Sequence, residues 1–235
     1  MTAKELQTQL KQTLRITEQS DYNIGGYANA QLLKVSTKLT GKMEGMTVIS
    51  SSMTNNANCQ KLSKCNGTIC QHCYSKSALS YRPNVRKCYE ANGEILSGSI
   101  IPKEQLPFIN SQYCRFESHG DLHNAIHLEN FVNIAKKNPH CQFALWTKQY
   151  KIVLDYFKTH KQPKNMNIII SSLMVNKPIN PAPFEAIGLK VKTFTVWDKE
   201  TAKNVEINCG GKKCIDCLSC YKKGGRVKVI NEVIK

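Results

Sequence analysis

The sequence lacks long apolar runs. No stretch approaches the ~20 consecutive apolar residues that a membrane-spanning helix needs, and the polar start, MTAKELQTQLKQTLRITEQS, does not resemble a signal peptide. We therefore expect a cytoplasmic protein with no membrane partner. Internal repeats and long low-complexity linkers are also lacking, which excludes a solenoid or a string of tethered modules. With 235 residues and 41% hydrophobic composition, residues 1–235 are expected to form one domain.

Acidic residues are scarce. The chain has 17 Asp and Glu against 33 Lys and Arg, which gives a formal net charge of +16 and a pI near 9.4. This balance favours an anionic partner such as a nucleic acid; the alternative is solubility in a lysine-rich composition. Part of the excess lies near the C-terminus, where residues 199–228 hold eight basic and three acidic side chains.

Cysteine, by contrast, is abundant. Of the 11 cysteines, eight fall into two groups with the spacings C-x5-C-x4-C-x2-C and C-x4-C-x2-C-x2-C. The first group is Cys59, Cys65, Cys70 and Cys73, and the second is Cys209, Cys214, Cys217 and Cys220. Cysteines stay reduced in the cytoplasm unless a metal binds them, and the total is odd. The spacing therefore favours metal sites over a disulfide framework.

The second group favours an iron–sulfur cluster over zinc. Its C-x2-C-x2-C run is the one used by bacterial ferredoxins, whereas zinc sites usually take two cysteine pairs from separate loops. We expect a [4Fe-4S] cluster in a C-terminal cluster-binding loop over residues 205–223. Cys209 is the least defined of its ligands, because ferredoxins often take the fourth thiolate from elsewhere.

The first group leaves its number of ligands open. With Cys59 as a fourth ligand the cluster would be closed; without Cys59 one iron would stay open for chemistry. Cys88 lies a short distance downstream and is a candidate extra ligand, which a cluster larger than a cubane would need. The alternative is that Cys88 is a small buried hydrophobic residue, as we expect for Cys114 and Cys141.

Strands and helices alternate along most of the chain. A polar N-terminal helical extension over residues 1–45 is expected first, with an amphipathic helix over 3–19. Strands are predicted over residues 47–53, 113–118, 142–147, 167–173, 191–197 and 226–230. Helices are predicted over residues 82–97, 124–137 and 149–159, with a short one after the proline-rich turn at 176–183. This order predicts an α/β fold with a parallel sheet, in the form of a partial or distorted βα barrel.

Polar side chains follow the predicted strands, where barrels carry their active sites. We expect Arg115 and Lys148 to bind an anionic substrate, and Glu117 and Asp121 to move protons. Ser118 and Asp198 are the candidate cofactor-binding residues. The alternative reading of each cluster is an ordinary turn or helix cap. Side-chain alternation allows either Arg115 with Glu117, or Cys114 with Phe116 and Ser118, to face inward. The spacing of His119, His123 and His127 is a weaker metal signal, because Gly120 interrupts the helix that would align them.

The order of these motifs resembles a family of uncharacterised phage proteins, the gene-product-eighty-eight family. The matching pieces are CNGTICQHCYS, RPNVRKCYEANGEIL, RFESHGDLHNAIHLENFVNIAKKNP, ALWTK, IIISSLM, TFTVWDK and CGGKKCIDCLSCY. The resemblance implies an iron–sulfur protein with a radical-SAM-like core, located in the host cytoplasm. In the radical SAM superfamily three cysteines spaced C-x3-C-x2-C leave one iron for S-adenosylmethionine. Here the loop reads C-x4-C-x2-C, and no glycine-rich segment for that ligand is evident.

Two functions follow from these observations. The first is a redox or radical-type enzyme with two [4Fe-4S] clusters, an electron donor and, if one iron is open, S-adenosylmethionine. The second is a non-catalytic nucleic-acid-binding protein stabilised by its metal clusters, with the basic C-terminal segment on phosphates. A pure electron carrier is the poorer alternative, given the chain length and the polar strand ends.

Overall fold

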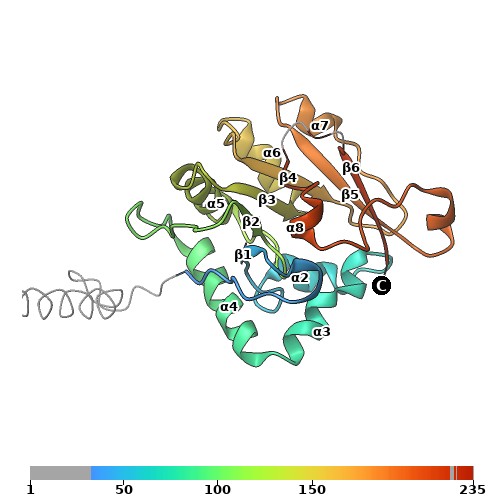
Figure 1. Ribbon diagram of the computed structural model, residues 1–235, viewed down its shortest axis with the longest axis horizontal. Helices are drawn as coiled ribbons and strands as arrows, with labels where there is room; N and C mark the ends of the chain where they lie inside the picture. The colour runs from blue at the N-terminus through green and yellow to red at the C-terminus, as the bar shows by residue number, and fades with distance from the viewer. Residues whose placement is uncertain (1–32, 223–224, 226, 235) are drawn as a thin grey trace, which may run out of the picture. The chain divides into compact units, whose positions relative to one another are not determined.

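Six parallel strands form the centre of the fold. The computed structural model describes residues 33–222, 225 and 227–234. The strands are β1 (Thr47–Ile49), β2 (Tyr113–Phe116), β3 (Gln142–Thr147), β4 (Met166–Ser171), β5 (Val191–Trp197) and β6 (Val229–Val233). All neighbours are parallel and follow the chain order from β1 to β6 (Figure 1). The predicted α/β alternation is therefore confirmed, with β6 beginning three residues later than expected.

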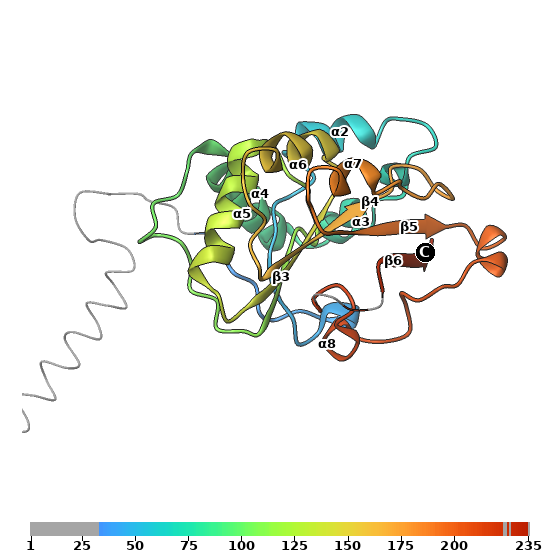
Figure 2. The ribbon, with the colours of Figure 1, turned by 90° about the horizontal axis from the view of Figure 1, so that it is seen from above.

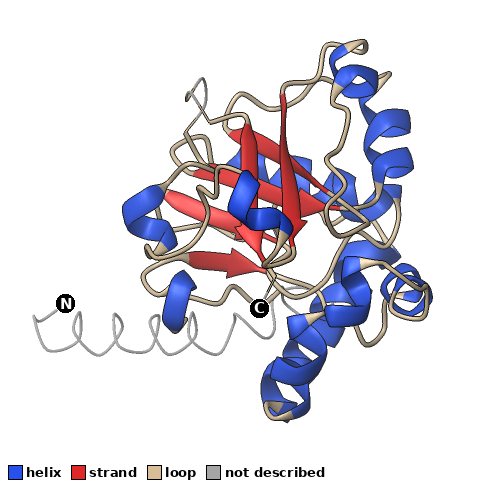
Figure 3. Ribbon diagram, turned by 90° about the vertical axis from the view of Figure 1, so that its right-hand side faces the viewer, coloured by secondary structure: helices blue, strands red, loops and turns tan. Residues whose placement is uncertain are grey.

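Helices occupy the connections between the strands (Figure 3). The two longest are α4 (Pro83–Gly98) and α5 (Ala125–Lys137), which lie before and after β2. The others are η1 (Gly41–Met43), α2 (Ala57–Leu62), η2 (Ile69–His72), α3 (Tyr74–Ser80), α6 (Tyr150–Phe157), α7 (Ala182–Glu185), η3 (Thr201–Asn204) and α8 (Cys214–Cys217). Three of these, α2, η2 and α3, surround the first cysteine group.

The sheet is open among the described residues. β1 pairs with β2, β6 pairs with β5, and no pairing joins β1 to β6. The expected barrel is thus represented by a six-stranded parallel sheet that does not close. In such a sheet the carboxyl ends of all six strands lie along one edge, where ligand sites of parallel α/β proteins usually form.

One face of the sheet packs against the long helices. Phe116 is stacked between Phe131 of α5 and Phe143 of β3, with ring centroids 4.1 and 4.7 Å away. The side chains on this face are fully buried in the main hydrophobic core, namely Cys114, Phe116, Phe143, Leu145, Ile168 and Ile170. Cys114 belongs to this set and Cys141 to the same core, so the prediction that both are buried is confirmed.

The opposite face packs against the second cysteine group. A separate hydrophobic cluster joins Ala144 and Ile169 of the sheet to Met46 and Tyr221, with Cys209, Cys214 and Cys220 packed against it. Figure 2 shows α8 on the other side of the sheet from α6 and α7. The sheet therefore separates the long helices from the C-terminal cysteine loop.

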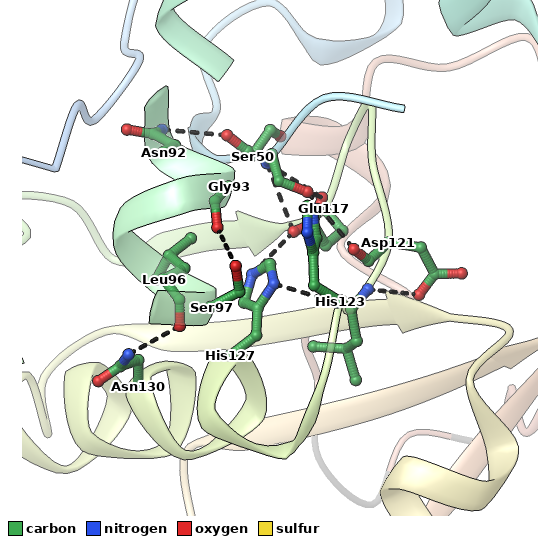
Figure 4. A network of polar contacts seen from close by, with 12 residues as sticks. Ser50, Asn92, Gly93, Leu96, Ser97, Glu117, Asp121, His123, His127 and Asn130 are labelled. Carbon is green, nitrogen blue, oxygen red and sulfur yellow. Dashed lines mark hydrogen bonds and ion pairs between the residues drawn. The ribbon is translucent and has the colours of Figure 1, made fainter. Parts of the chain in front are cut away.

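Buried asparagines fasten the connection between α4 and β2 onto α5. Asn130 accepts a hydrogen bond from the amide of Ile101 at 2.8 Å and donates to the carbonyls of Leu96 and Ser99, both at 2.8 Å (Figure 4). Asn138, directly after the end of α5, has a similar role and accepts a hydrogen bond from the amide of Ile109 at 2.8 Å. These side chains satisfy backbone groups that have no helix or strand partner.

The helix predicted over residues 3–19 lies outside the described residues. Among residues 33–222, 225 and 227–234, no helix has the length and apolar character required to cross a membrane.

We expect Asn130→Ala to lower the free energy of unfolding by about 3 kcal/mol, because three backbone groups lose their partner and two of these hydrogen bonds are buried. Denaturant unfolding monitored by circular dichroism measures the change. The matched control is Asn84→Ala on the exposed surface of α4, which should change stability by less than about 0.5 kcal/mol. Equal effects of the two substitutions would contradict this role of Asn130.

Candidate functional site

Glu117 lies at the carboxyl edge of the sheet, where β1, β2 and α5 meet. Its side chain is fully buried. The carboxylate accepts hydrogen bonds from the amide and hydroxyl of Ser51, at 3.1 and 3.0 Å, and lies 3.1 Å from Nε2 of His127 (Figure 4). The amide of His123 donates to Nδ1 of His127 at 3.3 Å. Nδ1 of His127 is therefore the acceptor nitrogen, and its Nε2 carries the proton. Nε2 faces Glu117, but the two groups are too poorly aligned to form a hydrogen bond.

The backbone conformation of Glu117 decides which side chains of β2 share a face of the sheet. Glu117 has a φ of 58°, in the left-handed region that non-glycine residues seldom adopt. The regular alternation of β2 therefore ends at Phe116. Arg115 lies over the ring of Trp146 at 4.5 Å, on the sheet face that packs against the C-terminal loop, whereas the carboxylate of Glu117 contacts α5. The two residues do not share one face, so the alternative in which Arg115 and Glu117 face inward together does not hold.

Asp121 is held by three donors at the same edge. The hydroxyl of Thr147 and the amides of Leu122 and Lys148 donate to its carboxylate at 2.6, 2.8 and 2.9 Å. Burial raises the pKa of Asp121, and Lys148 and these hydrogen bonds oppose the rise. The carboxylate thereby links the end of β3 to the loop after β2.

The loop that carries the first cysteine group is anchored along this edge. Asn56 accepts from the amide of Cys59 at 3.1 Å as the N-cap of α2, and it donates to the carbonyl of Asp121 at 2.7 Å. Farther along, the amide of Ile69 donates to the carbonyl of Leu173 at 2.8 Å, just after β4. A Cβ on Gly67 would lie 2.9 Å from the Met174 side chain, so the loop approaches that segment closely.

Lys148 lies among the thiols of this first group. Burial lowers its pKa, but the neighbouring Cys70, Asp121, Cys59 and Cys73 raise it, and the net pKa lies above the ordinary value. Lys148 forms no ion pair with a carboxylate among the described residues. The charges of Cys73 and Cys65 also affect the pKa of Cys70. Cys59, Cys70 and Cys73 thus lie near Lys148, and Cys65 lies near Cys70.

Cys59 lies among the thiols near Lys148, whereas Cys88 does not. The pKa of Cys59 is raised by burial and by Asp121, and it responds to Lys148 and Cys70 as well. The pKa of Cys88 is raised by burial and lowered by Lys34, with no contribution from another thiol. Cys88 and Cys59 both pack against a small cluster of Met53, Leu79 and Tyr89.

The second cysteine group forms the other thiol cluster. The thiols of Cys209, Cys214, Cys217 and Cys220 influence one another's pKa. Nζ of Lys42 lies 3.1 Å from Sγ of Cys209 and 2.7 Å from the carboxylate of Glu232. Burial raises the pKa of Cys220 to about 12, against the opposing effects of Arg115 and Lys192.

Arg115 adjoins the second cysteine group. Burial lowers its pKa, while Tyr74, Tyr221, Cys220 and Cys214 raise it, and Tyr74 directly follows Cys73. Its guanidinium donates to the carbonyl of Glu117 at 3.3 Å and to the sulfur of Met43 at 3.8 Å. Within the described part of the chain it has no carboxylate partner.

The remaining predicted residues have local roles. Ser118 is buried, and its hydroxyl lies 2.6 Å from that of Ser50. Asp198 accepts hydrogen bonds from the amide of Thr201, at 2.7 Å, and from the side chain of Asn176. These contacts are those of a residue that caps a turn, the alternative to cofactor binding. His119 packs between Tyr74 and Tyr89, with ring centroids 5.5 Å from each. Burial, with Arg115 and Arg82, lowers the pKa of His119 to about 4.

Single-ion geometry is not what these side chains provide. Among the described residues, no three His, Cys, Asp or Glu side chains are grouped so as to hold one metal ion. Four thiolates around one zinc ion would have to converge on a single point at about 2.3 Å. Each cysteine group offers an all-sulfur donor set, which is the kind that iron–sulfur clusters use.

Sequence reasoning missed two features of this site. The role of His127 as the partner of Glu117 is one; a histidine four residues after another was interpreted only as a metal signal. Lys42 is the other, because it lies outside every predicted motif. Its proximity to Cys209 depends on a contact between segments 167 residues apart.

Comparisons with known proteins give one match. No curated protein and no solved structure matches the chain, and nothing in these comparisons concerns radical SAM enzymes, so that part of the resemblance stays a prediction. The model of one protein family, described as Gene product 88, matches residues 28–232. Since this match spans most of the 235 residues, the chain belongs to the Gene product 88 family.

Proposed function

We propose that this protein is a redox protein with two iron–sulfur clusters. Cys209, Cys214, Cys217 and Cys220 would hold one cluster, against the sheet face that carries Arg115. Cys59, Cys65, Cys70 and Cys73 would hold the other, at the carboxyl edge of the sheet. When bound, such clusters supply one-electron transfer.

The observation that carries the proposal is a cation in each thiol group that forms no ion pair within the described part of the chain. Arg115 adjoins the second group and Lys148 the first, and neither forms an ion pair with a carboxylate among the described residues. Both side chains are partly buried. Withdrawing a charge from water without a partner is costly. A thiolate-held cluster is an anion; it would supply opposite charge beside Arg115, and beside Lys148 it would add to the charge of Asp121.

The surrounding side chains suit the tuning of such clusters. Hydrogen bonds to sulfur and nearby charges set the potential of an iron–sulfur site. Lys42 donates to Cys209 at 3.1 Å, and the hydroxyl of Ser219 lies 3.2 Å from the sulfur of Cys217. Nζ of Lys192 donates to the carbonyls of Ser219 and Lys222, which holds the loop against β5.

Glu117 and Asp121 have positioning roles in this proposal. Each carboxylate is engaged by two or three donors of the protein itself. A carboxylate so engaged is poorly placed to exchange protons with a substrate. We therefore reassign both residues from proton transfer to holding the strand ends against α2 and α5, and Lys148 remains the candidate for contact with an anionic substrate.

Protein purified under anaerobic conditions should contain about eight irons and eight sulfides, four of each per cluster. Cys214→Ala with Cys217→Ala should remove about half of the iron, and Cys70→Ala with Cys73→Ala the other half. The control is Cys141→Ala, which changes a core cysteine and should leave the iron content intact. Zinc in place of iron, without sulfide, would refute the proposal.

Cys59→Ala should lower the iron content as much as Cys70→Ala does, because Cys59 is one of the thiols around Lys148. Cys88→Ala should leave the iron content unchanged. Iron analysis with electron paramagnetic resonance of the reduced protein measures both. Retention of a full first cluster in Cys59→Ala would instead indicate a site of three cysteines, and a spectrum perturbed by S-adenosylmethionine would then support an open iron.

Removing either cation should lower the reduction potential of its own cluster, because a nearby positive charge favours the more negative, reduced state. Arg115→Leu should shift the second cluster, and Lys148→Met the first, each by about 60 mV or a tenfold change in a one-electron equilibrium. Redox titration followed by electron paramagnetic resonance separates the two. Each variant serves as the control for the other, and unchanged potentials in both would count against the role of the cations.

A further inference from the structure

A long acid-free segment surrounds the first cysteine group. Between Glu44 and Glu90 the sequence contains no Asp or Glu, yet it carries Lys61, Lys64, Lys76, Arg82, Arg86 and Lys87. A segment with charges of one sign only has no internal ion pairs, so its positive potential is available to an external partner.

This segment folds into one structural unit. It supplies α2, η2, α3 and the first turns of α4, and α3 packs against α4 (Figure 1). Leu79 of α3, Tyr89 of α4 and Met53 form a small hydrophobic cluster, against which Cys59 of α2 and Val85 of α4 also pack. The basic side chains are thus presented by helices that share one core.

The basic residues of this unit are exposed and unpaired. Lys61, Lys64, Lys76, Arg82 and Lys87 are all exposed. None of these five side chains forms an ion pair within the described part of the chain. Arg86 lies 3.8 Å from Glu90, the acidic residue at which the segment ends.

An exposed tyrosine lies next to one of these basic residues, at the junction of α3 and α4. Tyr81, at the turn between α3 and α4, is 84% exposed and is followed directly by Arg82. Tyr74 is 61% exposed, and its hydroxyl contacts the carbonyl of Ser118 at the carboxyl edge. Basic side chains around exposed aromatic rings are what proteins use to bind single-stranded nucleic acid, with phosphates on the cations and bases stacked on the rings.

We infer that the surface formed by Lys61, Lys64, Lys76, Tyr81, Arg82 and Lys87, the basic shoulder, binds single-stranded nucleic acid. An acidic protein would match the charges equally well but would leave the Tyr81 ring without a stacking partner. A duplex would offer phosphates but no free base faces. This inference stands apart from the proposed redox function, because binding requires neither cluster.

The test is fluorescence anisotropy of the full-length protein with a labelled twenty-nucleotide oligo-dT strand, its RNA counterpart and a duplex of equal length, across a salt series. Lys76→Glu with Arg82→Glu and Lys87→Glu should weaken single-strand binding at least about tenfold. Loss of three phosphate contacts should reduce the steepness of the logarithmic salt dependence by about 2. The matched control, Lys136→Glu with Lys161→Glu and Lys190→Glu, changes the net charge equally at exposed sites elsewhere.

Substitutions of Tyr81 measure the contribution of base stacking separately from that of charge. Tyr81→Ala should weaken single-strand binding about tenfold, the value of one stacked base, with an unchanged salt dependence, and Tyr81→Phe should bind normally. Equal weakening by the two triple variants, duplex binding as tight as that of the single strand, or no effect of Tyr81→Ala would overturn the inference. So would the absence of binding.

Iron analysis of the same samples keeps this test separate from the redox proposal. The shoulder variants should retain their iron and their thermal unfolding midpoint while they lose nucleic acid. Cys70→Ala with Cys73→Ala, depleted of the first cluster, should still bind the single strand. If the cysteine variant loses binding as well, the shoulder depends on the cluster, and the inference as stated is wrong.

Discussion

The carboxyl edge of the sheet depends on the buried carboxylate of Glu117. Its left-handed backbone costs roughly 1–2 kcal/mol for a residue with a Cβ, and the fold retains it because the turn directs the carboxylate at Ser51 and His127. Gly120 completes the arrangement. A Cβ there would lie 2.2 Å from the Ser51 hydroxyl and 2.6 Å from the Glu117 carboxylate. The connection after β1, the connection after β2 and helix α5 thus meet at one buried acid.

This arrangement explains how one sheet serves two cysteine groups of different character. The reversal at Glu117 leaves Arg115 as the last residue of β2 to face the C-terminal loop, where it stacks on Trp146. On the edge itself, Asp121 accepts from β3 and presents its carbonyl to Asn56, which caps the helix of Cys59. The first cysteine group therefore lies at the carboxyl ends of the strands, whereas the second covers one face of the sheet.

Much of the fold followed from the sequence, because its strands and helices have strong local signals. Runs such as QFALWT and VKTFTVW are apolar and β-branched or aromatic, and both strands have the predicted bounds. The helices around the first cysteine group were not predicted, since polar segments such as ANCQKL lack a repeating apolar face. Nor was the side-chain direction of Glu117, because alternation presumes a regular strand, and a single positive φ ends it. Lys42 and His127 were missed for a third reason: contacts between segments distant in sequence leave no periodic trace.

Arg115 and Lys148 have a further consequence for the proposed pair of clusters. Arg115 acts on Cys214 and Cys220 of the second group, and Lys148 acts on Cys59, Cys70 and Cys73 of the first. Each cluster would thus have a cation of its own to stabilise negative charge. Two negative clusters also repel each other, and they do so strongly where little water intervenes. Because each cation adjoins its own cysteine group, the two potentials would be set separately, one at the carboxyl edge and one on the sheet face that packs against the C-terminal loop.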